Sequence, residues 1–280
     1  CENNKTIGPL IHYTFNETYN NTIQDMGSSG YNMKYIGASL DSDNVNVGLN
    51  CLKLQNYSDV GLVGHWLLNE NNGKIANDIS SNSNNGTLTG EPSWLSNSGP
   101  DNGPCLDFDG SNDYVVTDSV STGSGGLNIT NKLTISCWVK SDTSNWNERG
   151  TIFTKNLSFT LEPTKDSKQI FFYVYTTGWN NVSYTITEDI TDWHLYTVTY
   201  DNINLKIYVD GILKATNSLS GNVNSTTGAI HIGKYYVTDN YLDGKMSDVR
   251  IYNRALTADE ITNLYNKNSY CKINYNSVLG

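Results

Sequence analysis

The sequence predicts an all-β fold of two packed antiparallel sheets, with one short helix near the C-terminal end. Short runs of alternating apolar and polar residues recur along the 280-residue chain, and polar turns separate them. Only residues 257–265 show helical spacing. The composition agrees with this prediction, because 19 Tyr and 24 Gly residues, with abundant Asn, Ser and Thr, favour strands and turns over helices. Such a pattern is typical of a β-sandwich.

Length and charge narrow the classes of function. A chain of 280 residues is long enough for one large β domain or two ordinary ones. Its net charge of −10 repels phosphate backbones, so we expect no nucleic-acid partner. No apolar run reaches the roughly 18 residues that a membrane-spanning helix needs, so we expect no membrane span.

Two stretches of the first sixty residues recur later in the chain. Seven of the 28 positions in residues 10–37 are identical in residues 63–90, and all seven share one register. Residues 51–54 recur in the same way at 105–108, now 54 positions on. We therefore interpret residues 1–60 as a β segment that partly duplicates the opening strands of the domain after it.

Only the second copy continues into a full set of strands. The strands expected after residue 105 are 106–108, 113–115, 133–140, 151–154, 169–175, 193–200, 205–209 and 229–233. The polar turn at Asp201 and Asn202 makes the runs on either side of it a hairpin.

The last strand is followed directly by the helix. Val249 and Ile251 alternate with polar neighbours as a half-buried strand requires. Thr257 begins the helix, and Glu260 stands three residues later, as in a capping box. The helix then carries an apolar stripe at helical spacing, formed by Ile261, Leu264 and Tyr265. Asp248, which opens the strand, is either a turn-capping carboxylate or part of a site.

The block from Asp248 to Leu256 resembles the last strand of laminin-G-like domains in the concanavalin A-like lectin/glucanase superfamily. Six further motifs of that family precede it in the family's order: Trp66–Glu70, Leu106–Gly110, Leu133–Trp138, Trp193–Tyr196, Tyr208–Gly211 and Ile232–Gly233. The resemblance implies a concanavalin A-like jelly roll over residues 61–268. Residues 269–280 are then a C-terminal tail.

The resemblance does not extend to the catalytic motif of the superfamily's glucanases. Those enzymes carry a Glu-x-Asp-x-x-Glu strand, because hydrolysis with retention needs two carboxyl groups about 5 Å apart. Here no two of the eight Glu residues lie within four positions of each other. No serine-nucleophile, zinc-protease or nucleotide-binding motif is present either. We therefore expect no enzymatic activity.

The resemblance implies one structural calcium ion, held between the early loops and the last strand. It points to Asp78 and Asp248 as ligands, with Asp109 and Asn85 as weaker additions. Calcium takes six to eight hard oxygen ligands, which carboxylates and amides supply. The alternative is that these side chains only brace Gly- and Asn-rich loops. The duplicated segment retains Asp25 at the place of Asp78.

Aromatic residues in the expected loops are candidates for glycan binding, as in lectin-like members of the superfamily. They are Trp146, Trp179 and Tyr241, and Asn180 is a polar neighbour that could take sugar hydroxyls. We weigh this against a simpler alternative, which we favour. Aromatic residues of this kind more often cover a core or lie in a protein interface.

The five cysteines are candidates for disulfide bonds, and an odd count leaves at least one thiol free or bonded outside the chain. They are Cys1, Cys51, Cys105, Cys137 and Cys271. The sequence contains no C-x-x-C pair, so the cysteines do not suggest a zinc or redox site. Nine N-x-S/T sequons permit a glycoprotein. We expect an extracellular or cell-surface location.

The half-copy at the N-terminus leads to our main functional hypothesis. Two strands alone cannot bury an apolar face, so those of the segment need a partner surface. The residues concerned are Leu10, Ile11, Tyr13, Phe15, Leu52 and Leu54. The partner is the same domain, the C-terminal tail, or the sheet edge of a second copy. The last option predicts a self-assembling, filament-forming, structural or adhesive surface protein. The competing hypothesis is a glycan-binding lectin module of an adhesin or degradative enzyme.

Overall fold

The computed structural model describes residues 60–117, 126–147 and 150–270, without the side chains of 267–270. It also describes the backbone of five short strands between residues 13 and 53. The chain divides into two units, Cys1–Val60 and Gly61–Gly280, and each is considered by itself.

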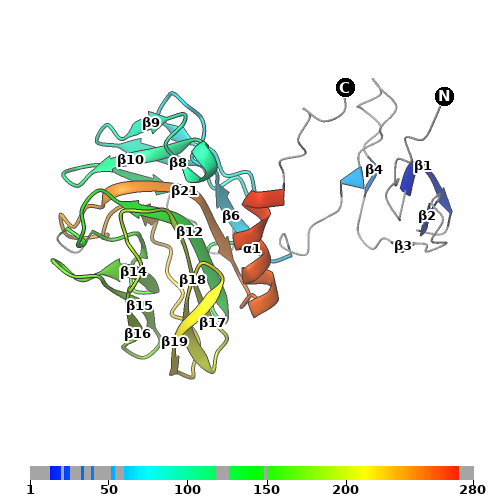
Figure 1. Ribbon diagram of the computed structural model, residues 1–280. Coiled ribbons are helices and arrows are strands. Elements are labelled where there is room, and N and C mark those ends of the chain that lie inside the picture. Colours follow the sequence, from blue (N-terminus) through cyan, green and yellow to red (C-terminus); the bar gives the residue numbers. More distant parts are fainter. Residues whose placement is uncertain are drawn as a thin grey trace. The chain divides into compact units, whose positions relative to one another are not determined.

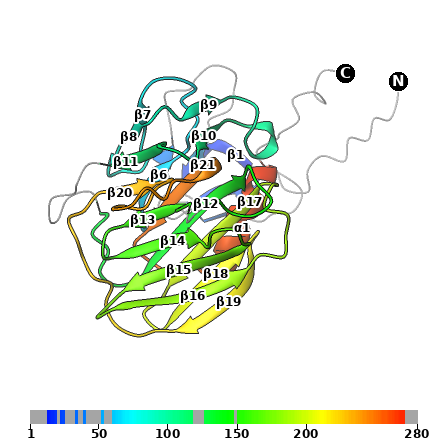
Figure 2. The same ribbon diagram turned by 90° about the vertical axis from the view of Figure 1, so that its left-hand side faces the viewer.

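The second unit, which we call the body, consists of two eight-stranded antiparallel sheets (Figures 1 and 2). The first sheet has the order β19 (Ile212–Ser218), β18 (Asn204–Val209), β17 (His194–Tyr200), β12 (Leu133–Ser141), β21 (Asp243–Tyr252), β10 (Cys105–Asp109) and β9 (Ser93–Leu95), with β6 (Leu62–Trp66) also paired to β21. The second sheet has the order β16 (Trp179–Thr185), β15 (Gln169–Tyr175), β14 (Phe159–Pro163), β13 (Phe153–Lys155), β20 (Ile230–Ile232), β11 (Tyr114–Thr117), β8 (Gly86–Thr89) and β7 (Ile75–Ala76). The predicted fold, two antiparallel sheets with one short helix, is confirmed.

The closing strand β21 lies at the centre of the first sheet because three strands pair with it. β12 runs along one side, while the other side pairs with β10 in its first half and with β6 in its second half. Val249 and Ile251 point into the core between the sheets, where both are fully buried. The predicted alternation of this strand is therefore confirmed.

A β-bulge interrupts β21 at Asp248. Ser136 of β12 lies opposite Arg250, but Trp138 lies opposite Ser247, so β21 has one residue more than its partner in this stretch. Asp248 adopts a positive φ of 52°, which bends the strand locally. The bulge directs the Asp248 carboxylate toward β6, where it meets its partners.

The helix α1 (Ala258–Tyr270) covers the outer face of the first sheet (Figure 1). The backbone N–H of Thr257 donates to Glu260 Oε2 at 2.8 Å, and the N–H of Glu260 donates to Thr257 Oγ1 at 3.3 Å, which is the expected capping box. Tyr265 stacks on Trp138 with ring centroids 5.7 Å apart. The second apolar cluster beneath the helix contains Trp138, Leu195, Tyr208, Tyr252, Leu256, Ile261 and Leu264. No helix among the described residues has the length and apolarity that crossing a membrane requires.

The first unit contains β1 (Tyr13–Tyr19), β2 (Thr22–Asp25), β3 (Met33–Lys34), β4 (Ser39–Leu40) and β5 (Leu52–Lys53). They pair in the orders β1–β2–β3 and β4–β5. Leu10, Ile11 and Leu54 lie outside the described residues, and the side chains of Tyr13, Phe15 and Leu52 are not described. The prediction that these residues mediate assembly therefore stays a prediction.

Candidate functional site

The outward face of the second sheet carries a row of aromatic side chains, and strict alternation along β15 places them there. Ile170, Phe172 and Val174 are fully buried in the core. The residues between them, Phe171, Tyr173 and Tyr175, keep partial exposure on the other face. Neighbouring strands β14 and β16 flank this row (Figure 2). A face of this kind offers flat apolar rings with polar rims to a ligand.

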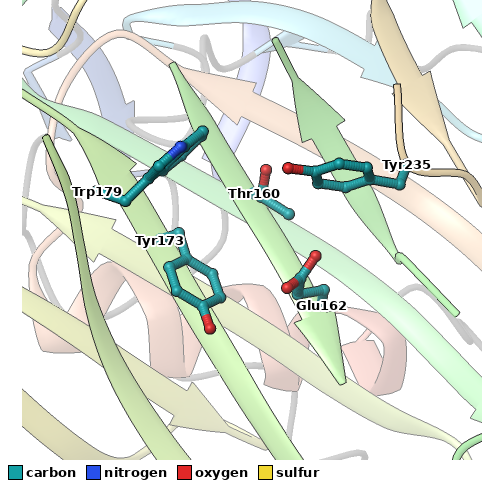
Figure 3. Close-up of a pocket in the computed structure, with 5 residues that line it drawn as sticks. All are labelled: Thr160, Glu162, Tyr173, Trp179 and Tyr235. Atoms are coloured by element: carbon teal, nitrogen blue, oxygen red, sulfur yellow. The ribbon is translucent and has the colours of Figure 1, made fainter. Parts of the chain in front are cut away.

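A pocket of about 220 Å³ opens on this face, lined by Thr160, Glu162, Tyr173, Trp179 and Tyr235. Figure 3 shows the hydroxyl of Thr160 and the carboxylate of Glu162 between Trp179 and Tyr173 on one side and Tyr235 on the other. Three strands contribute, β14, β15 and β16, while Tyr235 comes from the loop after β20. The pocket therefore combines aromatic walls with a polar floor.

The indole of Trp179 is fixed in place by two tyrosines. Its ring stands edge-on to Tyr175 at a centroid distance of 5.2 Å and to Tyr173 at 6.2 Å, with interplanar angles of 87° and 86°. Even so, 38% of Trp179 remains exposed. A large aromatic ring that is oriented by neighbours yet open to solvent is suited to stacking on a ligand.

The other residues predicted for glycan binding do not line this pocket. Trp146 is fully buried in the core, where it stands edge-on to Tyr196, so its prediction is wrong. Tyr241 lies beside Tyr114 and under the ammonium of Lys234, 5.4 Å from its ring centroid.

Asn180 follows Trp179 on β16 and its amide group is engaged locally. Its Nδ2 donates to the carbonyl of Gly178 at 2.9 Å and to the Thr176 hydroxyl at 3.3 Å. Successive residues of a strand point to opposite faces, so Asn180 faces away from the pocket that Trp179 lines. Of the four predicted glycan-binding residues, Trp179 alone belongs to this pocket.

The calcium ligand predicted in the early loops, Asp78, has both carboxylate oxygens occupied by protein donors. Oδ1 accepts the backbone N–H of His65 and of Ser80, each at 2.8 Å. Oδ2 accepts the Ser80 hydroxyl at 2.9 Å and the N–H of Asn84 at 2.7 Å. The backbone N–H of Asp78 in turn donates to Asn85 Oδ1 at 2.9 Å. Asp78 and Asn85 thus brace the loop.

The second predicted calcium ligand, Asp248, is paired with cationic and polar side chains. Arg250 binds it through two nitrogens, Nε to Oδ1 at 2.8 Å and Nη2 to Oδ2 at 2.9 Å. Nε2 of His65 lies 2.6 Å from Oδ1. Burial alone would raise the pKa of Asp248, but the charge of Arg250 and the hydrogen bond from His65 bring it down to about 2.

This arrangement does not fit calcium. A guanidinium occupies the carboxylate that calcium would need. Asp109, the last residue of β10, accepts the N–H of Ser111 at 2.8 Å. Across the described ranges, no three His, Cys, Asp or Glu side chains form a group that could hold a metal ion. Calcium binding by the chain stays a prediction, but Asp78 and Asp248 have other roles here.

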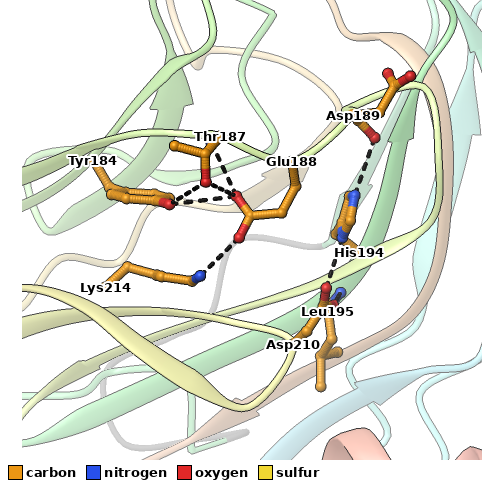
Figure 4. A network of polar contacts seen from close by, with 8 residues as sticks. All are labelled: Tyr184, Thr187, Glu188, Asp189, His194, Leu195, Asp210 and Lys214. Atoms are coloured by element: carbon orange, nitrogen blue, oxygen red, sulfur yellow. Dashed lines mark hydrogen bonds and ion pairs between the residues drawn. The ribbon is translucent and has the colours of Figure 1, made fainter.

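A polar network at the edge of the first sheet joins the loop before β17 to the turn after β18 and to β19 (Figure 4). His194 Nδ1 lies 2.7 Å from Asp210 Oδ2, and its Nε2 lies 3.0 Å from the carbonyl oxygen of Asp189. Both partners accept hydrogen bonds, so the protonated imidazole, which donates from both ring nitrogens, suits this geometry best. The hydrogen bond to Asp210 accordingly raises the pKa of His194.

In the same network, the Lys214 ammonium lies 2.7 Å from Glu188 Oε1. Burial alone would raise the pKa of Glu188, but the hydrogen bond from Lys214 helps bring it down to about 2. Both ring nitrogens of His194 are engaged by Asp210 and the carbonyl of Asp189, so neither is free to activate a nucleophile. We therefore assign these residues a structural role.

The two cysteines of the described body are free thiols. Cys105 and Cys137 are fully buried, and burial raises the pKa of Cys105 to about 11 and that of Cys137 further. Neither forms the disulfide for which it was a candidate. Cys1, Cys51 and Cys271 lie outside the described residues.

Comparison with known proteins agrees with this architecture. A family model for the concanavalin A-like lectin/glucanases superfamily matches residues 109–262. No curated protein matches the sequence.

Among solved structures, the binding domain of botulinum neurotoxin DC in complex with SialylT has a TM-score of 0.60 and 17% identity, over 76% of this chain and 53% of that one. The same domain in complex with rat synaptotagmin II has a TM-score of 0.58 and 17% identity, over 74% and 52%. The serotype G binding domain has a TM-score of 0.58 and 18% identity, over 75% and 51%. The chain thus spans about half the length of these structures and shares their fold.

Proposed function

Because this chain belongs to the concanavalin A-like lectin/glucanase superfamily, we propose that it is a non-catalytic module that binds neutral glycans. The observation that carries this proposal is the pocket of Thr160, Glu162, Tyr173, Trp179 and Tyr235 on the outward face of the second sheet. One face of a sugar ring is apolar and packs on an aromatic ring, while its hydroxyl groups need hydrogen-bond partners. The pocket supplies both kinds of contact.

The charge of the site favours neutral over acidic sugars. Glu162 is the one charged residue among the five that line the pocket, and it is an acid. The chain as a whole carries a net charge of −10. A sialic acid would bring a second carboxylate against this field, which costs binding energy. The neurotoxin domain bound to SialylT supports glycan binding in the same fold, but we propose a different sugar class for this chain.

The same pocket supports a binding role without catalysis. Hydrolysis of a glycosidic bond uses a pair of carboxyl groups on either side of the sugar. Glu162 alone among the lining residues carries a carboxyl group. An adhesive or anchoring role at an extracellular surface follows as part of the proposal, and surface labelling of intact cells with an antibody to the body would test the location.

A glycan array of neutral and sialylated oligosaccharides, followed by calorimetry with the best neutral ligand, tests the proposed function. We expect binding to neutral glycans, and about tenfold weaker affinity for Trp179→Ala because the stacking surface is lost. Trp94→Ala is the matched control, since Trp94 is half-buried on β9 in the other sheet. Binding of sialylated glycans alone, or equal affinities for both variants, would refute the proposal.

A further inference from the structure

Part of the strand pairing of the first unit recurs in the body, although the β1–β2 pairs Thr18–Ile23 and Tyr19–Thr22 have no counterpart among the pairs described there. Three pairs of the first unit recur in the body 53 residues later: Tyr13–Asp25 as Trp66–Asp78, Thr22–Lys34 as Ile75–Thr87, and Ile23–Met33 as Ala76–Gly86. Two more recur 54 residues later: Ser39–Lys53 as Ser93–Asp107, and Leu40–Leu52 as Trp94–Leu106. The described strands between residues 13 and 53 therefore share five pairs with the opening strands of the body.

The identical positions include the residues that hold the opening strands onto the body. His65 contacts Asp248 of the last strand and is retained as His12. Asp78, which fixes His65 and its own loop, is retained as Asp25. The partner of His65 lies outside the repeat, on β21. Retention of His12 therefore indicates that the first unit also belongs beside a closing strand.

A glycine that both its positive φ and its close packing require is retained as well. A Cβ on Gly90 would lie 2.3 Å from Asp113 Oδ1, and the residue has φ +81°, so a larger residue does not fit. Asp113, which follows the repeat, belongs to the body and accepts the backbone N–H of Glu91 at 2.7 Å. The first unit carries Gly37 at this place. The sequence of the first unit thus keeps glycine at the place where a residue like Asp113 could approach.

Two other positions do not match this particular body. A Cβ on Gly86 would lie 2.4 Å from Cγ1 of the fully buried Val115, so the strand or the Val115 side chain would have to shift within a close-packed core. The first unit carries Met33 there. At the second position, Asp107 lies 3.1 Å from the Lys245 ammonium. The first unit carries Lys53 instead, which would place two ammonium groups side by side.

A third difference between the two copies, at the place of Gly64, is accompanied by a second change that offsets it. A Cβ on Gly64 would lie 2.5 Å from the ring of Trp66. The first unit has Ile11 at the place of Gly64, but it also has the smaller Tyr13 at the place of Trp66. The smaller ring at position 13 removes part of the contact that a side chain at position 11 would meet, whereas Val115 and Lys245, the residues that Met33 and Lys53 would face, lie outside the repeat and are unchanged.

We propose that residues 10–54 are the opening strands of a second, different laminin-G-like body. That partner lacks opening strands of its own, has a residue smaller than Val115 at the corresponding place, and has no cation at the place of Lys245. An identical copy of this chain does not meet the description, because its own β6 and β10 already occupy the flank of β21. Adding strands to an incomplete sheet supplies main-chain hydrogen bonds, and side chains give the specificity.

A rearranged chain tests whether residues 10–54 fit this body. Deleting residues 55–108 places Leu54 directly before Asp109. Leu54 then has the position that Phe108 has in the full chain. We expect no cooperative thermal transition for this chain, because Met33 meets Val115 and Lys53 meets Lys245. The same deletion carrying Met33→Gly and Lys53→Asp should regain a cooperative transition. A chain lacking residues 1–54 is the control and should melt like the full chain.

Three results would overturn the proposal. If the unsubstituted deletion melts within a few degrees of the full chain, residues 10–54 serve this body after all. If the substituted deletion stays unfolded while the control folds, residues 10–54 are not a set of opening strands. If the control itself fails to fold, the first unit stabilises the body that follows it. Glycan binding by the full chain is independent of all three results.

Discussion

Nε2 of His65 lies 2.6 Å from Oδ1 of Asp248, and this contact joins the first strand of the body to its last across 183 positions of sequence. Arg250 binds the same carboxylate through two nitrogens. The side chains of Asp248 and Arg250 are only 16% and 18% exposed, so the ion pair lies largely out of water. The carboxylate expected to hold a metal ion instead neutralises an arginine.

The first prediction concerns this ion pair. Asp248→Asn leaves the Arg250 guanidinium mostly buried without its counter-charge, and we expect a loss of about 3 kcal/mol in the free energy of unfolding. Urea denaturation followed by fluorescence measures it. Asp109→Asn is the control, because Asp109 is exposed and accepts N–H groups of its own turn without pairing with a cation in the described residues. Similar losses for both variants would contradict the role assigned to Asp248.

The second prediction concerns calcium. Arg250, His65 and loop N–H groups occupy the oxygens of Asp248 and Asp78. We therefore expect that neither a chelator nor added calcium shifts the thermal midpoint of the full chain. Calorimetry with and without a millimolar chelator checks this. A midpoint that rises with calcium and falls with the chelator would show a calcium site built from other oxygens.

The third prediction is the pH dependence that His194 causes. Its pKa is raised in the folded state by the hydrogen bond to Asp210, so its stabilising effect is complete below the unfolded-state pKa. The effect is lost as the pH rises through the folded-state pKa. Comparing His194→Gln with the unchanged chain in urea at several pH values isolates this contribution. The stability difference should be larger at pH 5.5 than at pH 8.5, and a difference independent of pH would contradict a charged His194.

The fourth prediction concerns packing at Gly86. Alanine there would press on the buried Val115, and we expect a loss of about 1 to 3 kcal/mol in the free energy of unfolding. Gly178→Ala is the matched control, since a Cβ there meets nothing within 4 Å and no positive φ is required. Chemical denaturation of both variants decides the matter. If Gly86→Ala leaves the free energy of unfolding unchanged, the steric argument against Met33 at this place in the body is lost.

The fifth prediction concerns the assembly state. Since an identical copy offers no vacant place beside β21, we expect a monomer of 31.1 kDa by light scattering. Species of higher mass that disappear when residues 1–60 are removed would instead support the self-assembling, filament-forming protein. Measurements at several concentrations separate specific assembly from weak association.

Much of the fold could be predicted because its signals are local. The alternation around Val249 and Ile251 and the capping box of Thr257 and Glu260 lie within a few residues, and both are confirmed. β10 and β11 belong to different sheets, and this could not be predicted. The residues of the turn between Asp109 and Tyr114 do not differ from those of a turn within one sheet. The direction in which a turn leads depends on what packs on either side of it.

The site was harder to predict because exposure is a tertiary property. Trp146 stands among Asn and Ser residues and was expected on the surface, yet the core closes over it. The pocket residues Tyr173 and Tyr235 were missed, although β15 has a usable signal. Aromatic residues at 171, 173 and 175 alternate with core residues, so they had to lie on the outward face.

The repeated strand register has a consequence for how the protein is made. Both versions of the opening strands leave the ribosome well before β21, which must pair with one of them. Because a glycine stands at position 86 and a methionine at position 33, the nascent β11, which carries Val115 and pairs with β8, meets one acceptable neighbour and one obstructed competitor. The buried Cγ1 methyl group of Val115 thus disfavours pairing of the body with the wrong set of opening strands during synthesis.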